Sequence, residues 1–136
     1  MPTAGDKLGQ YTLHEMINSG GQSEIWLATD EAGRSFAVRL MLNDSVFAFT
    51  EKSRFTTGSE TLKACQDQHY IIGYVEHGKL GGSRALVMEY VEDGTLAEWL
   101  RVRARDWQEV VGVLAQAGEG LAAAHAAGLV HRDFKP

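Results

Sequence analysis

Two glycines between two alternating apolar segments are the first feature of the sequence that could carry chemistry. Gly20 and Gly21 lie in the turn-forming run from Asn18 to Ser23. Glycines at such a tip let the backbone approach a ligand closely, and successive N–H groups there hold phosphate oxygens. A plain hairpin turn is the alternative explanation of the same residues. The run therefore indicates a phosphate site only where other residues support it.

Charge and composition exclude several classes of partner. The 136 residues are 44% hydrophobic and 23% charged, which predicts one folded core. The formal net charge of −5 gives no reason to expect binding to nucleic acid or to an anionic membrane. We find no signal peptide and no membrane-spanning segment. The single cysteine, Cys65, is expected to be structural and fits a reducing compartment, so we expect a cytoplasmic protein.

Alternation of apolar and polar residues predicts the strands that position the glycine run. The third predicted strand places Arg39 on the same face as Ala37. A glycine-rich turn over 77–83 separates the last two strands. The five predicted strands cover residues 11–17, 24–29, 35–42, 71–76 and 84–90.

Three helices are predicted from capping residues and helical spacing. The first covers 51–66 with Thr50 as its N-cap, and the second follows 93–95 and runs to about Val102. Asp106 caps a longer helix over 106–127. An apolar stripe at steps of four and three follows that helix through Val110, Leu114, Ala117, Leu121 and Ala124.

Motifs in a fixed order give the glycine run a context. Asn18, Gly20 and Ser23 occupy the three glycine positions of the pattern G-x-G-x-x-G-x-V, whose last position is Ile25. The segment Phe36 to Arg39 then stands where the pattern V-A-I-K is expected.

Two later motifs complete the series. Residues 86–91 resemble a fifth strand and hinge, and the final hexamer, His131 to Pro136, matches H-R-D-L-K-P with one conservative change. From about Tyr11 to Pro136 the chain therefore resembles the protein kinase family. Within that family it is most similar to the eukaryotic-like bacterial serine/threonine kinases.

The resemblance implies an α+β fold and a division of the chain. We expect an N-terminal extension over 1–10 and a kinase N-lobe with its hinge over 11–91. This lobe would hold a five-stranded antiparallel sheet and one helix. The start of the helical C-lobe would cover 92–136, ending inside the catalytic loop.

The resemblance also implies an adenine site with apolar walls. Ile17 and Ile25 would sandwich the ring, Ala37 would lie flat against it, and Met88 would stand at the back of the pocket. Backbone groups of Glu89 and Val91 would hydrogen-bond the adenine. For each apolar side chain, ordinary core packing is the alternative.

The expected chemical step is transfer of the ATP γ-phosphoryl group to a protein serine or threonine. Asp133 would accept or orient the proton of the substrate hydroxyl, and Lys135 would steady the charge of the phosphoryl group. Glu60 would pair with the cation at position 39, although an exposed carboxylate paired with Lys63 is the alternative.

Two departures from the family pattern bear on this step. Arg39 replaces the lysine that contacts the phosphates, and its planar fork is not interchangeable with an ammonium. Asn18 and Ser23 add side-chain bulk to the loop. The ligands for Mg²⁺ would lie beyond Pro136, so Mg²⁺ is expected only in a complete kinase and the isolated chain is expected to be inactive.

Three hypotheses follow for the function. The chain is the ATP-binding part of a serine/threonine kinase, or part of a pseudokinase, or a nucleotide-free scaffold. Asp133 and Lys135 favour the first, and Arg39 favours the second. The apolar stripe of 106–127 is expected either to mediate self-association or partner binding, or to fold back on the small lobe.

Overall fold

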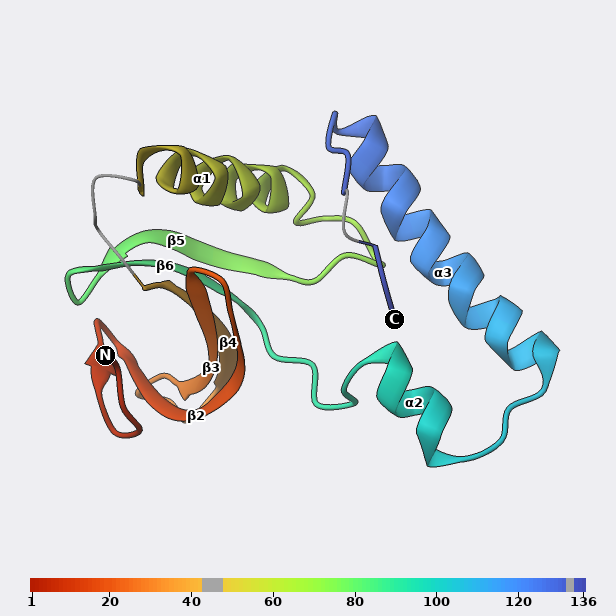
Figure 1. The fold of residues 1–136 in the computed structure, drawn as a ribbon, viewed down its shortest axis with the longest axis horizontal. Helices are drawn as coiled ribbons and strands as arrows, with labels where there is room; N and C mark the ends of the chain where they lie inside the picture. The colour runs from red at the N-terminus through yellow and green to blue at the C-terminus, as the bar shows by residue number, and fades with distance from the viewer. Residues whose placement is uncertain (43–47, 132–133) are drawn as a thin grey trace.

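The computed structural model describes residues 1–42, 48–131 and 134–136, and within them a sheet lies beside three helices (Figure 1). The described sheet has one strand more than the sequence predicts, because a two-residue strand at Lys7–Leu8 is too short to show alternation. The strands are β1 Lys7–Leu8, β2 Tyr11–Gly20, β3 Ser23–Thr29, β4 Ser35–Met41, β5 Tyr74–Leu80 and β6 Ser83–Glu89. The helices are α1 Ala48–Ala64, α2 Leu96–Val102 and α3 Trp107–Ala126.

All strand pairs are antiparallel, in the order β1-β2-β3-β4-β6-β5. Alternation along β3 buries Glu24, Trp26 and Ala28, and the buried carboxylate of Glu24 accepts a hydrogen bond from the Trp26 indole at 3.0 Å. In β4, Val38 and Leu40 are buried while Arg39 between them is exposed. The main core contains Leu8, Tyr11, Leu13, Trp26, Ala28, Val38, Leu40, Ala85 and Val87.

The sheet curves so that β1, at one edge, contacts the turn that joins β5 to β6 near the other edge. Gly81 has a φ of +54°, and a Cβ there would lie 3.4 Å from the Cα of Leu8, at the opposite edge. The buried phenol of Tyr11 in β2 donates a hydrogen bond of 2.5 Å to Glu76 in β5. These contacts join segments that are not neighbours in the strand order.

The last hairpin is tighter than predicted. β5 begins at Tyr74 and continues to Leu80, so the expected 77–83 turn shrinks to Gly81 and Gly82. His77, Gly78 and Lys79 each find a partner in β6, and this pairing outweighs the low strand propensity of glycine.

The first helix begins earlier than predicted. An N-cap residue has non-helical backbone angles, whereas Thr50 lies inside the first turn of α1, which starts at Ala48. The helix ends at Ala64, and the N–H of Cys65 still donates to Thr61. The prediction of Thr50 as the N-cap is therefore wrong.

The second and third helices carry the predicted caps. Thr95 and Asp106 each form a capping box, with Glu98 and Glu109 respectively, so both predicted starts are confirmed. α3 is the longest described helix at 20 residues, and none of the helices in the described ranges has the length and apolar character needed to cross a membrane.

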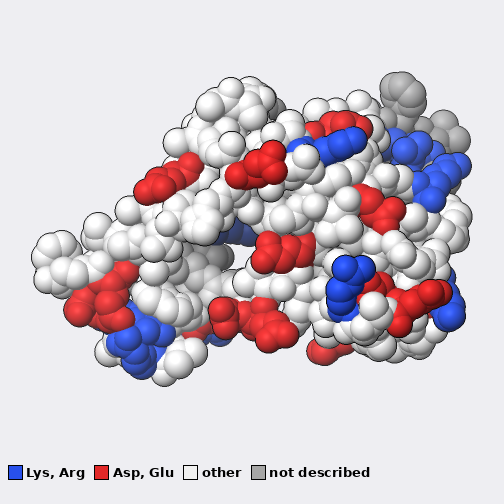
Figure 2. Space-filling model, turned by 180° about the vertical axis from the view of Figure 1, so that it is seen from behind, with Lys and Arg blue, Asp and Glu red and all other residues white. Residues whose placement is uncertain are grey.

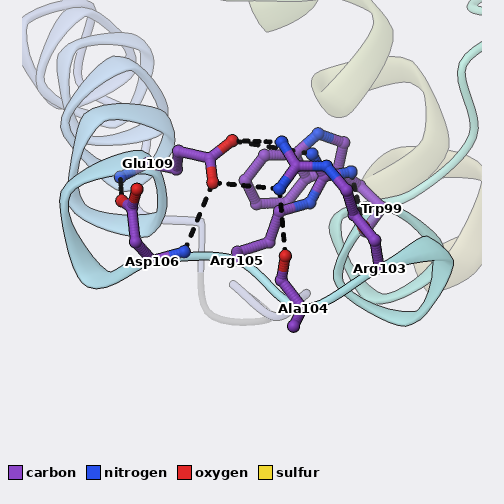
Figure 3. A network of polar contacts seen from close by, with 6 residues as sticks. All are labelled: Trp99, Arg103, Ala104, Arg105, Asp106 and Glu109. Atoms are coloured by element: carbon purple, nitrogen blue, oxygen red, sulfur yellow. Dashed lines mark hydrogen bonds and ion pairs between the residues drawn. The ribbon is translucent and has the colours of Figure 1, made fainter.

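A polar network ties α2 to α3 (Figure 3). Arg103 pairs with Glu109, and the Arg105 guanidinium lies 4.0 Å from the centre of the Trp99 ring while donating to the Trp99 carbonyl at 3.1 Å. The hydrogen bond from Arg103, with help from the backbone N–H of Asp106, holds the pKa of the Glu109 carboxyl below its usual value.

α3 approaches the segment before β5 at one small residue. Gly120 is buried, and a Cβ at this position would press against the carbonyl oxygen of Tyr70. A Cβ at Gly112 or at Gly118, on the same helix, would meet no atom within 4 Å. Close packing of α3 against the segment before β5 therefore depends on the absence of a side chain at position 120.

We expect Tyr11→Phe to lower the free energy of unfolding by about 1–2 kcal/mol at pH 7, because the mutation removes a buried hydrogen bond to a carboxylate. Burial, followed by the hydrogen bond to Glu76, raises the pKa of Tyr11 to about 12. The stabilisation is therefore present below pH 10, the ordinary pKa of tyrosine. It is lost as the pH rises towards 12, because Tyr11 ionises at a lower pH in the unfolded chain than in the folded protein. Urea unfolding at several pH values measures both effects.

Tyr70→Phe is the matched control, because the Tyr70 side chain is 41% exposed. It is expected to change stability by less than about 0.5 kcal/mol. Equal stability of Tyr11→Phe and the wild type at pH 7 would show that the Tyr11 hydroxyl contributes nothing to the closure of the sheet.

Substitutions of the α3 glycines are expected to have opposite signs. Gly120→Ala should destabilise the protein by about 1–3 kcal/mol, because the methyl group forces α3 away from Tyr70. Gly118→Ala and Gly112→Ala should stabilise it by about 0.5–1 kcal/mol through helix propensity. Thermal unfolding of the three variants measures the difference, and a stabilising Gly120→Ala contradicts the close approach.

Candidate nucleotide site

A hollow of about 840 Å³ lies between the sheet, α1 and α3. Figure 1 shows α1 running alongside β5 and α3 standing beyond the end of that strand, and Figure 2 shows the surface hollowed between the sheet and the C-terminal helices. The hollow therefore lies where the strand-rich part of the chain meets the helical part. The predicted site residues that line it are Asn18, Gly20, Ser23, Ile25, Arg39, Met88 and Lys135.

One wall of the hollow is apolar. Ile25 and Met88 contribute to it from β3 and β6, and Leu121 and Ala124 face it from α3. Ala37 is buried in β4 in direct register with Met88. Leu121 and Ala124 of the predicted stripe therefore face the hollow, whereas Leu114 of the same stripe is 43% exposed.

The side chains of three other residues predicted to contact adenine do not line the hollow. Ile17 and Val91 are 46% and 49% exposed and are not among the lining side chains. The Glu89 carboxylate accepts a hydrogen bond of 2.9 Å from the N–H of Gly73, and the Glu89 N–H donates to the Gly73 carbonyl. Glu89 thus fastens the end of β6 to the segment before β5.

Arg39 supplies a positive charge beside the glycine turn. Its Nε donates to the Ser23 hydroxyl at 3.1 Å, and its guanidinium lies 5.6 Å from the centre of the Phe55 ring. Strand β4 presents the side chain to the hollow because its neighbours Val38 and Leu40 point into the core.

The structure does not bring Glu60 to Arg39. Glu60 lies 3.0 Å from Nε2 of His77 in β5, and the other ring nitrogen of His77 shares a hydrogen bond of 2.8 Å with the Tyr74 hydroxyl. Among the described residues, the alternative pair with Lys63 is not formed either. α1 thus turns Glu60 towards β5 and turns Phe55 towards Arg39.

The C-terminal hexamer is described in part. His131, Phe134 and Lys135 line the hollow, and the rings of His131 and Phe134 meet edge to face. Asp133, the predicted catalytic base, and Arg132 lie outside the described residues.

Sequence reasoning missed the contribution of α1. Phe55, Ser59 and Leu62 line the hollow at helical steps of four and three, a spacing that could have identified this face. Arg54 also lines the hollow. Ser59 is buried and donates from its hydroxyl to the Phe55 carbonyl, and Cys65 is buried, as predicted for a structural residue.

The described residues do not fit a metal site. In residues 1–42, 48–131 and 134–136 no three side chains of histidine, cysteine, aspartate or glutamate gather closely enough to hold an ion. Residues outside these ranges would have to supply the ligands of Mg²⁺.

Comparison with known sequences agrees with this architecture. Residues 11–136 match the protein kinase domain family. The serine/threonine-protein kinase PknL of Mycobacterium tuberculosis is 38% identical over 93% of this chain, and PkaB of Streptomyces coelicolor is 34% identical over 96% of it. The chain spans about a third of the length of these relatives, 32% and 31% respectively.

Solved structures agree on the fold. The crystal structure of the kinase domain of PknI from M. tuberculosis aligns with a TM-score of 0.74 at 22% identity. The alignment covers 100% of this chain and 55% of that one. The family match over nearly the whole chain, the relatives and the α+β architecture all agree: this chain belongs to the protein kinase family.

Proposed function

We propose that the chain forms the ATP-binding portion of a serine/threonine protein kinase. One observation carries this proposal: the hollow joins an apolar wall, formed by Ile25 and Met88, to the cations Arg39 and Lys135. Purine rings favour apolar walls with few polar groups, and phosphates favour guanidinium and ammonium groups. A single site with these two ends has the chemistry that a nucleoside triphosphate requires.

The roles of the binding residues follow the family pattern. Ile25 and Met88 contact the adenine in this proposal, Ala37 lies beside Met88 in the same wall, and the backbone at Glu89 and Val91 hydrogen-bonds the adenine edge. The register of Ala37 with Met88 supports their sharing one wall. Asn18, Gly20, Gly21 and Ser23 lie at the end of the β2–β3 hairpin, which faces the phosphates in this proposal.

The chemical step uses the C-terminal hexamer. Asp133 accepts the proton of the substrate hydroxyl as its oxygen attacks the γ-phosphorus, and ADP leaves. Lys135 compensates the charge of the phosphoryl group during transfer. The presence of Lys135 in the hollow supports this assignment.

We expect Val91→Pro to weaken ATP binding by about five- to tenfold, because proline removes the N–H that the adenine edge accepts from. Calorimetric titration of the 136-residue chain with ATP and with adenosine measures the loss. Glu92→Pro, at an adjacent turn position, controls for backbone stiffening and should stay within about twofold. Equal affinities for the two proline variants would contradict the placement of adenine.

Asp133→Asn tests the transfer step. In a protein that joins these residues to the remaining segments of a kinase domain, we expect phosphoryl transfer to fall by about 10²–10⁴-fold, because asparagine cannot accept the hydroxyl proton. Labelled ATP with a serine-containing protein substrate measures transfer. ATP affinity should be unchanged, and transfer that survives in the variant would exclude Asp133 as the base.

A further inference from the structure

A second hollow of about 430 Å³ lies beside the first, below the β2–β3 turn. The two hollows adjoin, because a common set of residues lines both of them. Gly20 and Gly21 border the second hollow, and a Cβ at either position would meet no atom within 4 Å. The residues that line both hollows are Gly20, Ser23, Arg39, Arg54 and Phe55.

Arg54 brings a second guanidinium to this place. Its side chain is 74% exposed, and its ion pair with Glu51, three residues earlier on α1, is 3.5 Å long. An exposed ion pair of this kind contributes little to stability, so the Arg54 guanidinium can readily leave Glu51 and bind an anion that accepts stronger hydrogen bonds. Phosphate oxygens are such anions, because they accept two parallel hydrogen bonds from an arginine fork.

Arg39 is held in place while part of its fork remains available. Phe55 stacks against the guanidinium and Ser23 takes the Nε hydrogen. Among the described residues, no protein acceptor is bound by the two terminal nitrogens of Arg39. A preorganised fork loses less entropy when it binds a phosphate than a freely moving one.

The charge of the hollow also favours a polyanion. Among the described residues that line the second hollow, two arginines face one carboxylate, Glu51, on a chain whose formal net charge is −5. Glu60, the carboxylate that the family pattern places beside position 39, is instead bound to His77. Arg54, and not Glu60, therefore lines both hollows together with Arg39.

We propose that Arg54 is a phosphate-binding residue that clamps the polyphosphate chain of a nucleotide together with Arg39. The inference rests on the proposed function for the position of the nucleotide. It adds Arg54 to the residues that bind the phosphates, and it adds a preference for nucleotides with more phosphates. Adenosine has no phosphates and does not reach the two arginines of the clamp, whereas the triphosphate of ATP does. The chain therefore discriminates between nucleotides by the number of their phosphates.

Titration calorimetry of the 136-residue chain in EDTA, with ATP, adenosine and inorganic triphosphate, tests the clamp. Arg54→Gln should weaken ATP and triphosphate binding by about three- to tenfold and leave adenosine binding unchanged. Arg54→Lys should lose part of the affinity, because an ammonium keeps the charge but not the fork. Glu51→Gln should strengthen ATP binding, because it removes the competing carboxylate.

Lys63→Gln is the matched control, because it removes one positive charge from the same helix outside both hollows. It should leave all three affinities within about twofold, and Arg54→Gln matching it would overturn the clamp. If ATP and adenosine bind but Arg54→Gln has no effect, the clamp fails and the proposed function stands. If triphosphate binds through Arg54 and adenosine does not bind, the clamp stands and the adenine site fails. If none of the three ligands binds, both are wrong.

Discussion

Backbone pairing of β4 on both of its edges is the constraint on which the rest of the structure depends. β4 pairs with β3 from Ser35 to Met41 and with β6 from Phe36 to Leu40. Because side chains alternate along a strand, a slip of one residue would turn Arg39 into the core and Val38 into the hollow. The same ladder sets Ile25 and Leu86 beside Arg39. One register thus fixes both the apolar wall and the cation.

α1 is positioned by weaker means than the strands. No ladder holds it, and its described side-chain contacts with the sheet include the stacking of Phe55 on Arg39 and the Glu60–His77 pair. The Glu60 side chain is 58% exposed, so this ion pair contributes little to stability. The buried Ser59 adds packing to these contacts, and the resulting rotation of α1 decides whether a carboxylate or a guanidinium faces the phosphate side of the hollow.

Local signals in the sequence were sufficient for much of the fold. Alternation around Val38 and the caps Thr95 and Asp106 identified elements that the structure confirms, because neighbouring residues alone determine them. The short strand at Lys7–Leu8 and the extension of β5 through Gly78 depend on partners elsewhere in the chain. No local pattern carries that information.

The site was predicted unevenly for the same reason. Motif order identified Asn18, Gly20 and Ser23, together with Arg39 and Met88, and all five line the hollow. Motif order could not reveal that Glu60 prefers His77, since that preference arises from the packing of α1 against β5. Arg54 belongs to no motif, and only the fold brings it near Arg39.

The network between α2 and α3 has a mechanical consequence. Arg103 pairs with Glu109 and Arg105 lies over the Trp99 ring, so side-chain contacts join the two helices. The pair of helices meets the rest of the protein at two places, through the short segment after β6 and at the contact of Gly120 with Tyr70. A movement of α2 and α3 relative to the sheet would change these two places and leave the strand pairing unchanged, because neither helix belongs to the sheet.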